Sequence, residues 1–113
     1  MSKRQPELLL EDILESAGKI LDFTKGMTFI EFSDDIKTID AVIRNFEIIG
    51  EAANLLPDEF KNANQQIEWH RIKGFRNRIV HHYFGVDIQI VWDIIHAQIS
   101  DIIRDITNLL QKH

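Results

Sequence analysis

The feature that most constrains the fold is a long apolar stripe near the C-terminus of the chain. From Ile88 to about Leu110, apolar residues return every three or four positions, which is the spacing of one face of an α-helix. Isoleucine dominates the stripe, and its β-branched side chain has a weaker helix propensity than leucine or alanine. Packing against other helices or a second chain must therefore help to hold this segment together. The stripe comprises Ile88, Val91, Trp92, Ile95, Ile99, Ile102, Ile103, Ile106 and Leu110.

The same periodicity predicts two long helices in the N-terminal half. The first is expected from Glu7 to about Lys25, with Gly26 in the usual C-terminal place for glycine. The second is expected to start after Ser33, acting as its N-cap, and to end at Pro57. The first stripe is Leu10, Ile13, Leu14, Ala17, Ile20 and Leu21, and the second is Ile36, Ile39, Val42, Ile43, Phe46, Ile49, Ala53 and Leu56.

The remaining segments are shorter. Met27–Phe32 is apolar and β-prone, but a lone strand would have no partner, so we expect a packed loop. Pro57–Gln66 is polar and is expected to be a connector with one helical turn around Asp58–Lys61. A third periodic helix is expected from about Glu68 to Val80. It should bury Trp69, Ile72, Phe75 and Ile79.

Four helices, three of them long, joined by short connections predict an all-α fold. We expect an up-and-down antiparallel bundle of four to five helices that is homodimeric. With 113 residues, the chain has room for one modest core, so residues 1–113 should form a single domain.

Composition removes several classes of function. The chain has no cysteine, which excludes disulfides, thiolate zinc sites and cysteine nucleophiles and fits a reducing cytoplasm. No stretch approaches the roughly 18 apolar residues of a membrane span, and Met1–Pro6 is polar, so we expect a cytoplasmic protein with no membrane contact. The net charge of -5 argues against a general nucleic-acid coat protein, although it leaves room for a local basic site.

One segment gathers the residue types that could carry out chemistry. Arginine offers a fixed fork of donors for a phosphate, and histidine can give and take a proton near neutrality, so the pair suits phosphodiester cleavage. RNA supplies its own nucleophile, the 2'-hydroxyl, so no metal or cofactor is expected. Arg71, Lys73 and Arg78 are expected to contact RNA. The third helix and the residues after it contain Arg71, Lys73, Arg76, Arg78, His70, His81 and His82.

The spacing of Arg76 and His81 creates a geometric difficulty. On a continued helix these two positions lie about 140° apart. We therefore expect the helix to distort or end near His81, so that a terminating turn brings Arg76, His81 and Tyr83 around one pocket, with Gly85 and a capping Asp87 marking the break. A two-fold dimer would place two copies of Arg76 and His81 around one cleft, so the acid and the base could come from different chains.

At several positions a surface or packing role is an alternative to a functional one. An arginine and a histidine on a helix are usually surface residues, and spacing alone favours that view. From the residues alone, His70, His82 and His96 are assigned no role. A metal site made by His81, His82 and Asp87 is disfavoured, because adjacent histidines point apart on a helix.

Two segments resemble a known family. Gly74–Asp87 resembles the G-x-R-N-x-x-x-H-x-Y-x-x-x-D signature of the HepT-like proteins of the HEPN superfamily. Arg44–Ala53 is similar to the second-helix motif of the same family, and the resemblance covers essentially the whole chain. Glu47 and Glu51 lie one turn apart within that motif; such pairs are usually a solvated face, although they could orient Arg76.

The resemblance implies a homodimeric bundle with metal-independent endoribonuclease activity in a composite dimer cleft. Carried over by position, Arg76 and His81 would be catalytic, Asn77 a polar neighbour and Tyr83 part of the site. His82 leaves the identity of the proton carrier open. The family commonly pairs with a nucleotidyltransferase antitoxin of the MNT type, which can transfer AMP to the motif tyrosine, here Tyr83. An added nucleotide would bring bulk and negative charge into a phosphate-binding cleft.

Two alternatives to a ribonuclease toxin remain at this point. One is a catalytically silent HEPN module that binds a nucleotide or a nucleotidyltransferase through the same cleft. The other is a purely structural helical dimer, in which the basic segment is incidental.

Overall fold

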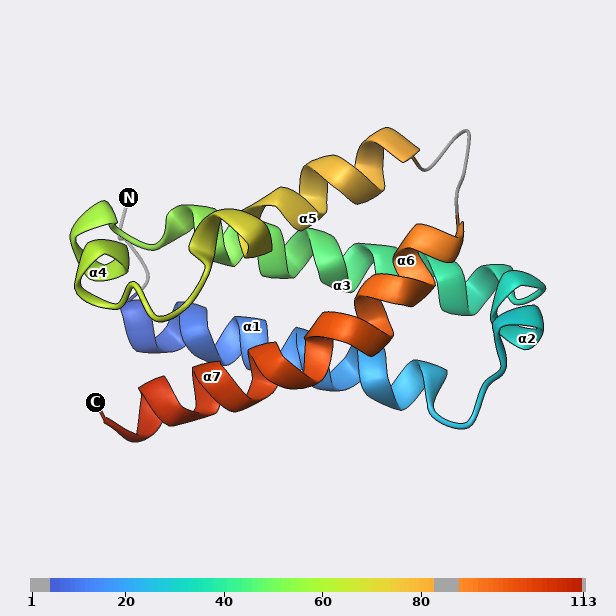
Figure 1. Ribbon diagram of the computed structural model, residues 1–113, viewed down its shortest axis with the longest axis horizontal. Coiled ribbons are helices and arrows are strands. Elements are labelled where there is room, and N and C mark those ends of the chain that lie inside the picture. Colours follow the sequence, from blue (N-terminus) through green and yellow to red (C-terminus); the bar gives the residue numbers. More distant parts are fainter. Residues whose placement is uncertain (1–4, 83–87, 113) are drawn as a thin grey trace.

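The computed structural model describes residues 5–82 and 88–112, and for residues 76–82 it describes the backbone alone. All regular elements in these ranges are helices, so the predicted all-α class is confirmed. Figure 1 shows α1, α3, α5 and the α6–α7 segment as long, roughly aligned rods, with the short helices α2 and α4 at opposite ends of the bundle.

Helix α1 spans Pro6–Thr24, close to its predicted bounds. Gly26 follows it with a φ of 76°, a left-handed conformation that glycine adopts without steric cost. The hydroxyl of Thr24 donates to the carbonyl of Ile20 at 2.8 Å, so this buried polar group is satisfied within the last turn.

The predicted packed loop at Met27–Phe32 is wrong, because helix α2 spans Phe29–Ser33. Its start is stabilised by a capping box: the Thr28 hydroxyl accepts from the Glu31 amide at 3.1 Å, and the Glu31 carboxylate accepts from the Thr28 amide at 2.8 Å. The helix buries Phe32 in the core. The pattern Thr-x-x-Glu before Phe32 was the signal that propensity arguments missed.

Ser33 is not the N-cap of the next helix, since it belongs to α2 and donates to the carbonyl of Ile30. Helix α3 spans Ile36–Leu55 and is capped by Asp35, whose carboxylate accepts from the Thr38 amide at 3.1 Å and from its hydroxyl at 2.7 Å. Ile36, the first residue of the predicted stripe, is 71% exposed, because the stripe turns inward only from Ile39.

Helix α4, Asp58–Ala63, confirms the expected helical turn in the connector and extends it by two residues. Helix α5 spans Trp69–His82 and packs chiefly on α3. Figure 1 shows it on the outside of the bundle, with its C-terminal half rising away from the other helices. Trp69, Ile72 and Phe75 are buried as predicted, and the side chain of Ile79 lies outside the described part.

The predicted C-terminal helix has the right extent but is interrupted. It comprises α6, Ile88–Ile94, a π-helical turn at Ile95–Ile99, and α7, Ser100–Gln111. A π turn holds more residues than an α turn and therefore rotates the buried face along the chain. The buried positions differ from the predicted stripe, because the core also takes Ile94 and Leu109; its members from this segment are Val91, Ile94, Ile95, Ile99, Ile102, Ile106 and Leu109.

No helix in the described ranges is long and apolar enough to cross a membrane.

Candidate functional site

Helix α5 carries most of the predicted site, and aromatic packing fixes its rotation about its own axis. The ring of Phe75 is fully buried and meets that of Phe46 on α3 edge to face, with centroids 5.5 Å apart. At the start of the helix, the indole of Trp69 donates to the carbonyl of Asn64 at 3.0 Å and packs against Phe60. Contacts at Trp69 and at Phe75 therefore fix the inner face of α5 over the part of the helix whose side chains are described.

This rotation decides which positions face outward. His70, Arg71 and Lys73 are exposed, and Gly74 is partly so. The positions 70, 74, 77 and 81 succeed one another at intervals of four, three and four residues, so they occupy one strip of the helix within an arc of about 60°. That strip lies roughly opposite Ile72 and its buried neighbours. The predicted site positions Asn77 and His81 thus fall on the outward strip, whereas position 76 falls on the side toward α3.

The helix does not end between Arg76 and His81, because its backbone is helical through His82. Positions 76 and 81 therefore lie about 140° apart on this helix. The expected end of the helix near His81, with the turn that would gather Arg76, His81 and Tyr83, involves residues 83–87, which lie outside the described part, so it stays a prediction. The side chains of residues 76–82 lie outside the described part, as do Tyr83, Gly85 and Asp87 entirely. The roles predicted for Arg76, Asn77, Arg78, His81 and Tyr83 stay predictions.

The charge of α5 differs from that of the rest of the chain. The helix contains four of the 13 lysines and arginines and none of the 18 carboxylates. Arg71 pairs with Glu68, just before the helix, at 2.9 Å, but both side chains are more than half exposed, so solvent screens the pair. Lys73 makes no ion pair with any residue that the structure describes. A local basic surface on an acidic protein is the result.

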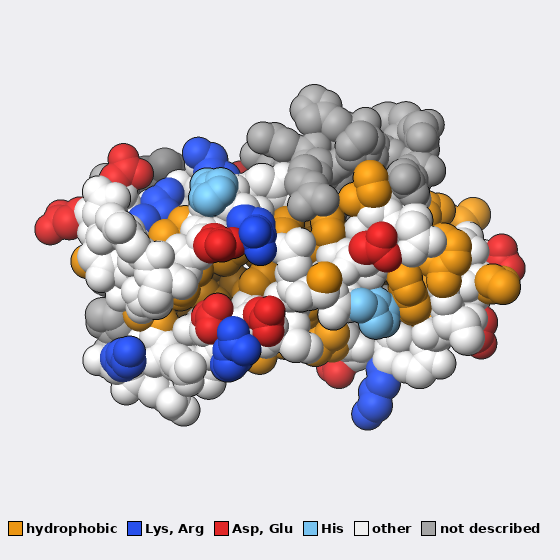
Figure 2. Space-filling model, viewed as in Figure 1, with side chains coloured by type: hydrophobic (Ala, Val, Ile, Leu, Met, Phe, Trp, Pro, Cys, Tyr) orange, Lys and Arg blue, Asp and Glu red, His pale blue; other side chains and the backbone are white. Residues whose placement is uncertain are grey.

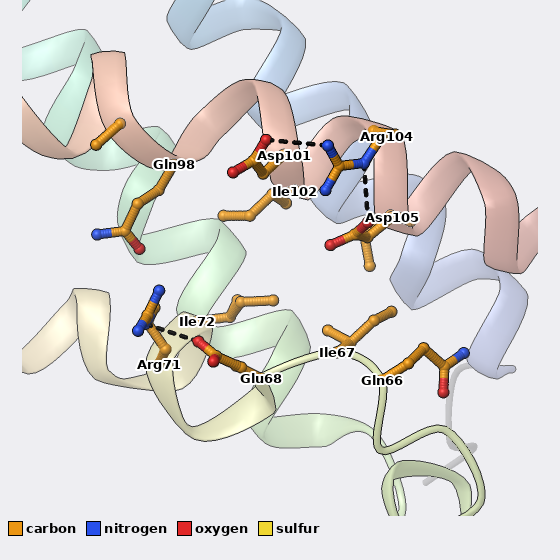
Figure 3. A pocket seen from close by; sticks show the side chains of 12 residues that line it. Gln66, Ile67, Glu68, Arg71, Ile72, Gln98, Asp101, Ile102, Arg104 and Asp105 are labelled. Atoms are coloured by element: carbon orange, nitrogen blue, oxygen red, sulfur yellow. Dashed lines mark hydrogen bonds and ion pairs between the residues drawn. The ribbon is translucent and has the colours of Figure 1, made fainter.

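A groove of about 280 Å³ separates the start of α5 from α7 (Figure 3). Ile67, Ile72 and Ile102 contribute to its apolar lining. One edge carries the Arg71–Glu68 pair; on the other, Arg104 bridges Asp101 at 3.3 Å and Asp105 at 3.2 Å. Figure 2 shows acidic (red) and basic (blue) side chains on both edges of this groove. Three carboxylates against two arginines make the groove itself a poor site for a phosphate.

The groove was not predicted, since it forms between segments that are distant in sequence. Within it, Gln98, from the π turn, has a buried amide oxygen without a hydrogen-bond partner in the described part of the chain. His96, on the same turn, is exposed; its Nδ1 lies 3.0 Å from the carbonyl of Trp92, and its ring packs on the indole with centroids 4.2 Å apart.

Glu47 and Glu51 lie in a second groove, of about 310 Å³, between α1 and α3. Asp12 and Arg44 line it with them. Whether these glutamates orient Arg76 stays a prediction, because the side chain of Arg76 is outside the described part. Among the described residues, no three histidine or carboxylate side chains are grouped so that they could hold a metal ion.

Comparison with known proteins adds independent information. The profile of the family described as "Ribonuclease HepT-like" matches residues 13–109. The Methanocaldococcus jannaschii protein named "Putative RNase MJ0127" is 41% identical over 111 residues, which is 98% of this chain and 92% of that protein. The Thermococcus cleftensis protein named "Probable ribonuclease HepT" is 39% identical over 100 residues, which is 88% of this chain and 91% of that protein. No solved structure matches.

Proposed function

Because this chain belongs to the Ribonuclease HepT-like family, we propose that it is a metal-independent endoribonuclease whose site lies on α5. The observation that carries the proposal is the coincidence of motif and charge. The Arg-x4-His spacing of Arg76 and His81 falls on a helix that gathers four basic residues and no acid in a chain of net charge -5. Arg71, Lys73 and Arg78 would add to the attraction for phosphates.

The proposed reaction needs only protein side chains. His81 of one chain removes the proton of a ribose 2'-hydroxyl, and the oxygen attacks the adjacent phosphorus while the bond to the 5'-oxygen breaks. A second histidine gives a proton to the departing 5'-oxygen. The products are a 2',3'-cyclic phosphate and a free 5'-hydroxyl. Arg76 holds the negative charge that builds on the phosphorane, with Asn77 and Tyr83 as polar neighbours.

The continuity of α5 supports a composite site made by two chains. Positions 76 and 81 are about 140° apart on a continuous helix, so one chain would not present both to a single phosphate. A two-fold dimer could gather both copies of Arg76 and His81 around one phosphate. The base and the acid would then be His81 of the two chains.

We further propose that the protein is the toxin of a toxin–antitoxin pair with an MNT-type nucleotidyltransferase. The hydroxyl of Tyr83 would attack the α-phosphorus of ATP, releasing pyrophosphate and the phenolic proton. The attached AMP would place a negative charge beside Arg76 and repel RNA. Family membership supports this partner, and Tyr83 occupies the position of the motif tyrosine.

The test is cleavage of total RNA in EDTA by wild type, Arg76→Ala and His81→Ala, with His82→Ala to settle which histidine carries the proton. Arg104→Ala serves as the matched control, because Arg104 is an exposed arginine on α7 held by two aspartates. Light scattering after size exclusion reports whether each variant is a dimer. The proposal requires cleavage by wild type and the control, and loss of cleavage by dimeric Arg76→Ala and His81→Ala.

Other outcomes assign other functions. A wild-type protein of unmodified mass that binds a nucleotidyltransferase but never cleaves RNA would be a silent binding module. A wild-type mass increased by one AMP on Tyr83 would instead identify the inactivated form. Loss of the dimer in both motif variants would make the motif structural.

A further inference from the structure

Among the residues that the structure describes, none explains why position 74 is a glycine. It lies inside α5, where glycine is less favourable than alanine because it leaves more backbone freedom to be lost. A Cβ built at this position would meet no heavy atom within 4 Å in the structure as described. Its φ is not positive, unlike that of Gly26, so the backbone does not call for glycine either. A close approach by another molecule would account for the missing side chain.

Gly18 provides a matched comparison inside α1. A Cβ there would also meet nothing within 4 Å, and its backbone is equally helical. The surroundings differ in charge. On an α-helix the nearest surface neighbours stand three and four residues away. Around Gly18 these include Glu15 and Asp22, whereas around Gly74 they are His70, Arg71, Asn77 and Arg78. Only Gly74 lies on a surface that would attract an anion.

The charge pattern also selects the occupant of the Gly74 face. In the proposed dimer the basic α5 helices of two copies line one cleft, and their like charges repel one another unless an anion lies between them. A polyanion in that cleft would meet the exposed side chains of His70 and Lys73, and Lys73 has no ion-pair partner within the described part of the chain. The position of Gly74 is about 10 Å along the helix from that of His81, within reach of a neighbouring nucleotide.

We propose that Gly74, with Lys73 and His70 beside it, seats the sugar-phosphate backbone of the RNA substrate next to the nucleotide being cleaved. The inference rests on the proposed ribonuclease function. The absent side chain lets the RNA backbone lie against the helix backbone, while Lys73 supplies the opposite charge and His70 a ring nitrogen for a hydrogen bond. Gly74 is therefore a positioning residue: it sets how closely the substrate approaches, and the chemistry belongs to other residues.

The experiment measures binding of a 2'-O-methylated RNA oligonucleotide, which cannot be cleaved, by fluorescence anisotropy. Gly74→Ala and Gly74→Leu are compared with Gly18→Ala and Gly18→Leu. Because displacement of a bound group by an ångström or so is enough to disrupt function, Gly74→Leu should raise Kd by about tenfold or more, and Gly74→Ala by less. Both Gly18 variants should bind like wild type. Both alanine variants should melt at slightly higher temperature, since alanine favours the helix.

Charge gives a second readout that does not depend on the fold of the leucine variant. Lys73→Gln should lower the slope of log Kd against log salt by about one unit if Lys73 contacts a phosphate. Lys19→Gln, on the outward face of α1, should leave the slope unchanged. If Lys73→Gln leaves the slope unchanged and Gly74→Ala binds RNA like wild type, the proposed contact of Gly74 and Lys73 with the RNA backbone is wrong. This conclusion holds even if Gly74→Leu is misfolded.

Failure of the proposed ribonuclease function and failure of the RNA contact at Gly74 give different results. If wild type neither binds nor cleaves RNA, the proposed function itself is wrong. If wild type cleaves RNA but the Gly74 variants bind it with unchanged Kd, only the proposed RNA contact at Gly74 is wrong. If folded Gly74→Ala becomes monomeric while Gly18→Ala stays dimeric, the Gly74 face belongs to a second copy of the chain, and the inference is likewise overturned.

Discussion

Helices α1 and α5 pack on the same helix, α3, yet they present different surfaces outward. Their inner faces are alike: Ile13 and Ile20 on α1, and Phe75 on α5, are fully buried. Outward, α1 is acidic: it carries five carboxylates and one lysine, Lys19, which pairs with Glu15 at 3.4 Å, whereas α5 carries bases without any acid. The inner faces build the bundle, and α5 is the helix on which we propose that the functional site lies.

The largest expected effect would sharpen this contrast through chemistry. His81→Ala should reduce RNA cleavage by about 10²–10⁴-fold, because a general acid–base group contributes that much to rate. Lys19→Ala on α1 should leave the rate unchanged. Initial rates on a fluorescent RNA in EDTA, with circular dichroism to confirm folding, measure the effect. Equal rates for His81→Ala and wild type would remove the functional distinction between the helices.

The second prediction tests whether the inner faces are as equivalent as they look. Phe75→Ala should lower the free energy of unfolding by about 3–5 kcal/mol, because it deletes a buried ring and leaves a cavity against Phe46. Ile13→Ala on α1 should cost about 2–5 kcal/mol for the same reason. Urea unfolding followed by circular dichroism reports both values. A loss below 1 kcal/mol for Phe75→Ala alone would show that α5 is not part of the core.

The third prediction concerns charge alone. Lys73→Glu should weaken binding of non-cleavable RNA by about tenfold or more at low salt, because it replaces a phosphate partner by a repelling carboxylate. Lys19→Glu makes the same change in net charge on α1 and should have a much smaller effect. Anisotropy titrations at two salt concentrations check this, and equal losses for the two variants would mean that only net charge matters.

The smallest effect is expected at Asp35, which caps the helix that supports both α1 and α5. The hydrogen bonds from the side chain and backbone of Thr38 lower the pKa of Asp35 below its usual value of 3.8. A lowered pKa means that the carboxylate stabilises the fold above the unfolded pKa and that this stability is lost as the pH falls through the folded one. Asp35→Ala should therefore melt earlier than wild type at pH 7, and the difference should shrink below pH 4.

Asp35→Asn is the control for that experiment, because an amide oxygen can still cap the helix without a charge. It should melt close to wild type at pH 7 and show a flatter dependence on pH. A difference between Asp35→Ala and wild type that stays constant down to acidic pH would contradict the role of the ionised carboxylate.

Much of the helical layout could be predicted from periodicity, and the failures have specific causes. The stripes placed α1, α3 and the C-terminal segment within a few residues of their bounds. Helix α2 was missed because Phe29 to Phe32 looks β-prone, and the Thr28–Glu31 capping box outweighs that propensity. The π turn was missed because the adjacent Ile94 and Ile95 allow more than one register of the buried face, and the choice depends on packing against α1.

The sequence by itself determined that this chain is a helical bundle and where its motif lies. Helix periodicity and residue chemistry are local properties, so they can be recognised in one segment without knowing which segments pack against it. The apolar stripes also indicated which side of each helix is buried, as Trp69, Ile72 and Phe75 show. Tertiary structure alone decided which helices meet: Phe75 packs on Phe46 of α3, and the start of α5 lies across a groove from α7. Such contacts follow from packing between segments distant in the chain, which no local pattern encodes.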